Sequence, residues 1–78
     1  MKTATDIATE IGFYDDPKND DLLSCVVVES LRAGVPGNLR DITPDHVALR
    51  KVDRLAMRLV DDGVLAFDED SDTWALAD

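Results

Sequence analysis

The hydrophobic residues in the first half of the chain recur every three or four positions, the spacing of an amphipathic helix. From Asn19 or Asp20 onward, one half of the helical circumference carries Leu22, Leu23, Val26, Val27, Ser30 and Leu31. Gly34 and Pro36 are suited to end this helix. Three consecutive valines at 26–28 favour a strand when taken locally, but the length of the pattern and the signals at both ends predict a helix.

Shorter apolar patterns lie on either side of this helix. Residues 3–12 have Ile7 and Ile11 one helical turn apart, and they predict a short helix capped by Thr5. After it, residues 15–19 are polar and predict a loop. Residues 38–43 have room for one helical turn that carries Leu39 and Ile42 inward.

A second long helix is expected to begin at Thr43, Pro44 and Asp45, which supply a capping hydroxyl, a proline and an acid in the order of a helix start. The pattern continues to Asp62, and Gly63 is expected to end it. One broad apolar stripe contains Ala48, Leu49, Val52, Leu55, Ala56, Leu59 and Val60.

The hydrophobic spacing changes to two after Gly63, which is typical of strands. Residues 64–67 and 73–76 predict two strands, and the polar residues 68–72 predict the turn of a β-hairpin between them. The side chains expected on the buried side are Leu65, Phe67, Trp74 and Leu76.

The order of helix, short helix, turn, long helix and hairpin resembles a winged helix-turn-helix domain. Residues 38–43 resemble its second helix and turn, and residues 52–65 resemble the end of its third helix running into the wing. The resemblance implies an α+β fold, a helical bundle with a C-terminal β-hairpin wing over residues 20–78, preceded by an N-terminal segment over residues 1–19. It also implies that the third helix, about residues 44–62, enters the DNA major groove.

The composition is strongly acidic, yet not that of a disordered chain. Of 78 residues 45% are hydrophobic, and 17 acids against eight bases give a net charge of −9. Fourteen of the acids are Asp. Such a composition resembles that of proteins from halophilic archaea and their viruses, although an ordinary acidic cytosolic protein can share it.

The bases are not spread evenly through this acidic chain. Arg50, Arg54 and Arg58 follow at four-residue steps with Lys51 beside them, so they share one helical face away from the apolar stripe. Only Asp53 opposes them between residues 46 and 60, which gives that segment +3 and leaves −12 for the rest. Because arginine can bind phosphates or guanine edges, this face suits duplex DNA.

These observations predict a sequence-specific DNA-binding protein, a transcriptional regulator of a halophilic archaeon or its virus. In the family's docking mode, Arg40 contacts the DNA backbone and His46 and Val47 point to base edges. The complete set of predicted DNA-binding residues is Arg40, His46, Val47, Arg50, Lys51, Arg54 and Arg58.

Two alternatives remain open. In the first, the basic face is simply solvated and weakly paired, as Arg50 with Asp53 or Arg54 with Asp61. In the second, the whole domain is a winged-helix protein–protein interaction module without DNA binding, since fold does not fix function. The acidic residues of the expected wing tip, 68–72, favour this second alternative because they repel phosphate.

Other chemistries find little support in the residues. With a single His and a single Cys, no glycine-rich phosphate loop and no cluster of metal ligands, the chain is not expected to be an enzyme or to hold a cofactor or metal. Cys25 is expected to be a small apolar filler. The acids at 68, 70 and 72 resemble the start of a calcium loop, but Thr73 stands where glycine is needed.

The chain is predicted to be cytoplasmic and to have no membrane partner. Its beginning lacks an apolar signal-peptide core, and its apolar runs, such as residues 25–28, are far too short to span a bilayer. A homodimer is expected through the apolar residues of the N-terminal segment, Ile7, Ile11, Phe13 and Tyr14.

Overall fold

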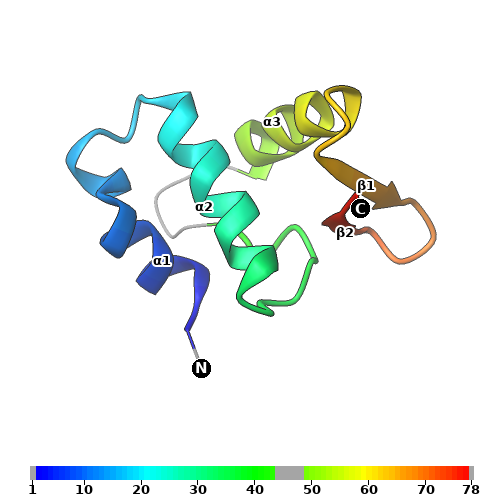
Figure 1. Ribbon diagram of the computed structural model, residues 1–78, viewed down its shortest axis with the longest axis horizontal. Coiled ribbons are helices and arrows are strands. Elements are labelled where there is room, and N and C mark those ends of the chain that lie inside the picture. The colour runs from blue at the N-terminus through cyan, green and yellow to red at the C-terminus, as the bar shows by residue number, and fades with distance from the viewer. Residues whose placement is uncertain (1, 44–48, 78) are drawn as a thin grey trace.

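The computed structural model describes residues 2–43 and 49–77, and in these ranges it contains three α-helices and a two-stranded antiparallel sheet (Figure 1). Along the chain the elements are α1 (Ala4–Ile11), the 3₁₀-helix η1 (Phe13–Asp15), α2 (Asp20–Arg32), α3 (Leu49–Asp61), β1 (Leu65–Asp68) and β2 (Thr73–Leu76). The predicted α+β fold class is confirmed. The C-terminal position of the hairpin is consistent with a winged helix.

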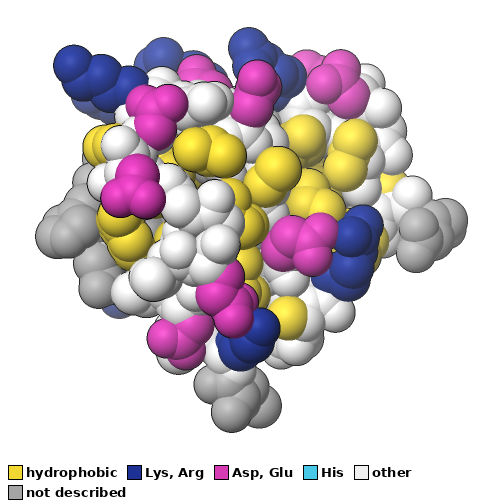
Figure 2. All heavy atoms as spheres, turned by 60° about the vertical axis from the view of Figure 1, so that its left-hand side comes forward, with side chains coloured by type: hydrophobic (Ala, Val, Ile, Leu, Met, Phe, Trp, Pro, Cys, Tyr) yellow, Lys and Arg dark blue, Asp and Glu magenta, His cyan; other side chains and the backbone are white. Residues whose placement is uncertain are grey.

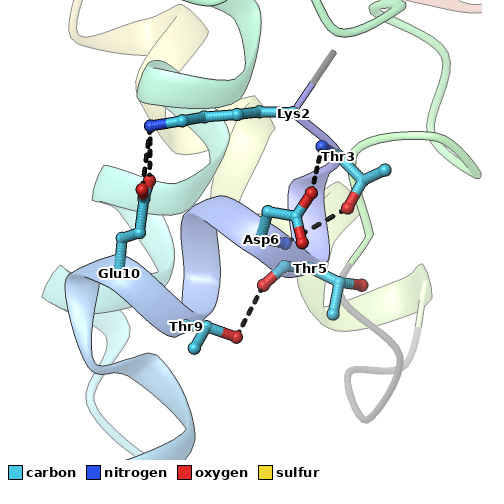
Figure 3. Close-up of polar contacts among 6 residues, drawn as sticks. All are labelled: Lys2, Thr3, Thr5, Asp6, Thr9 and Glu10. Atoms are coloured by element: carbon cyan, nitrogen blue, oxygen red, sulfur yellow. Dashed lines mark hydrogen bonds and ion pairs between the residues drawn. The ribbon is translucent and has the colours of Figure 1, made fainter.

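The N-cap of the short helix α1 lies two residues earlier than the sequence indicated. Thr3, not Thr5, is the N-cap: its hydroxyl accepts from the Asp6 backbone N–H at 3.1 Å, and its own N–H donates to the Asp6 carboxylate at 3.1 Å (Figure 3). Thr5 lies inside the helix, where its carbonyl accepts from the Thr9 hydroxyl. The prediction of Thr5 was wrong because Thr3 and Asp6 cap the helix together. Each side chain accepts a hydrogen bond from the backbone N–H of the other residue, so two N–H groups at the helix start are satisfied.

Replacing Thr3 by alanine is expected to lower the free energy of unfolding by about 1 kcal/mol, the usual cost of losing an N-cap. Thr5→Ala is the matched control, because it removes the same atoms from a position that makes no cap hydrogen bond. Urea denaturation followed by circular dichroism measures both. Equal losses in the two variants would show that the cap is not at Thr3.

Helix α2 is the central element of the fold (Figure 1), in contact with α1, η1, α3 and β2. It begins as predicted, with the Asn19 side chain accepting from the backbone of Asp21 at 3.0 Å. The expected apolar face is confirmed: Leu23, Val26, Val27 and Ser30 are buried, and Leu22 and Leu31 are half-buried. Cys25 does not fill the core as expected, since it is exposed.

After α2 the chain contacts the hairpin at Gly37 and Asn38 and then makes one turn over residues 38–42. The backbone N–H groups of Asp41 and Ile42 donate to the Asn38 carbonyl at 2.9 and 3.1 Å, and Ile42 is fully buried. This is the expected single turn, although no helix is assigned to it. The Trp74 N–H donates to the Gly37 carbonyl at 2.8 Å, and Asn38 forms a β-bridge with Thr73.

The predicted hairpin is confirmed in its strands and in its buried side. Leu65 pairs with Leu76 and Phe67 with Trp74, so all four side chains lie on one face. Leu65 and Trp74 are buried, while Phe67 and Leu76 are half-buried against the core. Trp74 therefore belongs to the core rather than to a surface platform.

The apolar side chains of the N-terminal segment pack within their own chain. Ile7 and Phe13 are buried in the core, and Ile11 and Tyr14 pack against it half-buried. Ile7 and Phe13 are thus not the spare surface that the dimer prediction assumed, and the homodimer itself stays a prediction. None of the helices in residues 2–43 and 49–77 has the length and apolar content to cross a membrane.

Candidate nucleic-acid interface

Helix α3 presents a buried apolar side and an exposed basic side. Val52, Leu55, Ala56 and Leu59 are buried. Arg50, Arg54 and Arg58 are exposed, and Lys51 is half-buried beside them. Because residues four apart lie above one another on a helix, packing of the apolar stripe against the core directs the three guanidinium groups outward together.

The basic side of α3 lines a pocket. The pocket has a volume of about 380 Å³, and the described residues that line it are Asp20, Arg50, Lys51, Arg54, Leu55 and Arg58. Asp20 is the first residue of α2, so the pocket lies between the start of α2 and the exposed side of α3. Figure 2 shows Lys and Arg side chains along the top of the molecule, at the height of these two elements in Figure 1, with Asp and Glu beside them.

One of the four bases on α3 has an acidic partner. Lys51 Nζ lies 3.4 Å from Asp20 Oδ1. Within residues 2–43 and 49–77, no ion pair involves Arg50, Arg54 or Arg58. The pairs expected for a merely solvated face, Arg50 with Asp53 and Arg54 with Asp61, are therefore not formed.

Two of the four bases outside α3, Lys2 and Arg32, form ion pairs, whereas Lys18 and Arg40 form none among the described residues. Lys2 Nζ lies 2.8 Å from Glu10 (Figure 3), and Arg32 Nη1 lies 2.7 Å from Glu29. The three arginines of α3 keep their guanidinium donors available for an external anion.

Of the remaining predicted DNA-binding residues, only Arg40 lies among the described residues. Arg40 is exposed on the turn that follows Asn38, and its backbone N–H donates to the Asn38 side chain at 3.0 Å. It does not line the pocket. His46 and Val47 lie outside the described residues, as does the predicted start of the helix at Pro44 and Asp45.

The sequence did not assign Asp20 to the site. A carboxylate in the first turn of a helix is favourable by itself, so its presence at residue 20 does not indicate a site. Nothing in the spacing of the chain indicates that residue 20 lies beside residue 51. The contact depends on how α2 and α3 pack together.

The tip of the hairpin remains acidic and exposed in the structure. Asp68, Glu69, Asp70 and Asp72 are all exposed, and the turn that carries them projects away from the helices (Figure 1). The Asp70 backbone N–H donates to the Asp68 carboxylate at 3.0 Å. Across the described part of the chain, no three His, Cys, Asp or Glu side chains are grouped so as to hold a metal ion.

Comparison of this chain with models of protein families, with curated proteins and with solved structures finds no match.

Proposed function

We propose that this protein binds double-stranded DNA through the basic side of α3 and acts as a small sequence-specific regulator. One observation carries the proposal. Arg50, Arg54 and Arg58 are exposed on a single face and have no carboxylate partner among the described residues, although the chain has a net charge of −9.

The chemistry of this face matches that of a duplex. The major groove, about 12 Å wide, admits an α-helix, and arginine can bind guanine O6 and N7 or a phosphate with two parallel hydrogen bonds. Arg50 and Arg54 are expected to enter the groove, with Arg58 toward the backbone. In this arrangement, contacts to phosphates position the protein on the duplex, and contacts to base edges in the groove recognise the sequence.

The overall negative charge opposes binding at a distance but not at contact. At about 1 M salt the Debye length falls to about 3 Å, so the acidic remainder of the chain no longer repels the duplex, whereas touching pairs are screened much less. A halophilic environment, which the Asp-rich composition suggests, supplies such conditions. The proposal is therefore compatible with the net charge.

Replacing Arg54 by alanine is expected to weaken duplex binding about tenfold and to reduce the slope of log K against log salt by about 0.9 if it binds a phosphate. Fluorescence anisotropy with labelled duplexes in 0.1–1 M potassium chloride measures both quantities. Arg50→Ala should behave in the same way. Arg32→Ala is the control, because it removes the same charge from an exposed arginine of α2 that is paired with Glu29.

Absence of binding in the unmodified protein, or equal binding by the Arg54→Ala and Arg32→Ala variants, would contradict the proposal. A target sequence can be sought first by selection from a random duplex pool. Specific binding then requires a site-dependent difference that remains when salt is raised.

A second candidate function is an interaction module for a basic protein partner. The exposed carboxylates of the hairpin tip favour it, since like charge near phosphate is repulsive. The same titration separates the two candidates. A module without DNA binding gives no anisotropy change with any duplex. Its binding to the basic protein partner is lost when Asp70 and Asp72 are neutralised, but not when residues of α3 are changed.

A further inference from the structure

One carboxylate lies inside the basic face. Asp20 and Lys51 approach within 3.4 Å, and both line the pocket that Arg50, Arg54 and Arg58 share. The Asp20 side chain is 55% exposed and that of Lys51 is 42% exposed. Water and an incoming anion can therefore reach the pair.

We infer that Asp20 is an internal competitor for DNA phosphate: it holds Lys51 out of the contact and thereby sets the strength and salt dependence of binding. This inference rests on the proposed function. A carboxylate and a phosphate are both anionic oxygen acceptors for the same ammonium group. For Lys51 to bind DNA, either the pair with Asp20 must break or a phosphate must approach the carboxylate, and both reduce the gain.

The arginines of the same face have no such competitor among the described residues. Three cations, rather than the four that the sequence provides, are then free to neutralise phosphates. Each neutralised phosphate contributes about −0.9 to the slope of log K against log salt. The unmodified protein is thus expected to show a slope that includes the arginines and omits Lys51.

Asp20→Asn tests this directly, because it keeps the side-chain shape and removes the charge. We expect the variant to bind duplex about tenfold more tightly at 0.1 M salt, with the gain shrinking toward 1 M and the slope steeper by about 0.9. Asp21→Asn is the matched control: it removes the same charge from the neighbouring position of the same helix end, where no ion pair is formed among the described residues. This control measures how much the affinity for duplex changes when one nearby carboxylate is removed without breaking an ion pair.

Lys51→Met separates competition for Lys51 from simple repulsion. In the unmodified protein this change should weaken binding by a smaller factor than Arg54→Ala does, because Lys51 is already paired with Asp20. In the Asp20→Asn background it should remove most of the tenfold gain and restore the original slope. Circular dichroism of every variant verifies that α2 and α3 remain folded.

The outcomes distinguish failure of the inference from failure of the proposed function. Equal gains for Asp20→Asn and Asp21→Asn, or a loss for Lys51→Met in the unmodified protein as large as that for Arg54→Ala, overturns the inference and leaves DNA binding intact. Lack of duplex binding by the unmodified protein and by Asp20→Asn alike overturns both.

Discussion

Replacing Phe13 by alanine is expected to lower the free energy of unfolding by about 4 kcal/mol, within the range measured for buried phenylalanines. Phe13 is fully buried in η1, and its ring meets that of Tyr14 edge-on at a centroid distance of 5.6 Å. The short 3₁₀-helix touches both α1 and α2. Truncation thus opens a cavity where three elements meet.

Urea denaturation at fixed potassium chloride concentration measures this effect. A 78-residue domain has a total stability of only about 4–12 kcal/mol, so the variant should be largely unfolded in moderate denaturant. Phe13→Leu is the matched control, because it nearly keeps the volume and should cost less than about 1.5 kcal/mol. A loss below about 1 kcal/mol for Phe13→Ala would mean that α1 and η1 are not part of the core.

Gly37→Ala is expected to be the second most damaging of the single changes considered, with a loss of about 3 kcal/mol. A Cβ atom at this position would lie 2.2 Å from the Trp74 carbonyl oxygen and 3.2 Å from its carbon. Both are backbone atoms of β2, and the Trp74 N–H is bonded to the Gly37 carbonyl. The strand cannot move away without breaking the connection between the loop and the hairpin.

Gly34→Ala provides the comparison that isolates this clash. Gly34 has φ +87°, but no atom lies within 4 Å of a Cβ built there. Its substitution should cost about 1–2 kcal/mol, the ordinary penalty for a left-handed backbone in a non-glycine residue. In thermal unfolding, the Tm of Gly37→Ala should be well below that of Gly34→Ala. The reverse order would show that the loop does not approach β2 so closely.

The interior of the fold follows from local patterns. The buried residues of α2 and α3 recur with the period of a helix, and those of the hairpin recur with the period of a strand. The buried face of each of these elements could therefore be predicted from the sequence. The three valines of α2 illustrate how a weak local preference for strand yields to the burial of a whole helical face. Misplacing the first cap had another cause: Thr3 and Thr5 are chemically alike, but Asp6 stands three residues after Thr3 and completes a capping box with it.

The contacts between distant segments had no such local signal. Gly37 was not expected to lie against Trp74, and Asp20 was not expected to lie beside Lys51. Both contacts depend on the relative positions of elements that the hydrophobic period does not report. The hydrophobic period determines which side of a helix or strand is buried, but not which residues of a neighbouring element contact the edge of that side.

The same distinction applies to the basic face. By itself, the sequence determined that Arg50, Arg54, Arg58 and Lys51 share one side of a helix, because four-residue spacing and the 3.6-residue turn leave no other arrangement. Only the tertiary structure decided which of these cations is already paired, since an ion pair requires two side chains to meet within about 4 Å and Asp20 reaches Lys51 through the packing of α2 against α3.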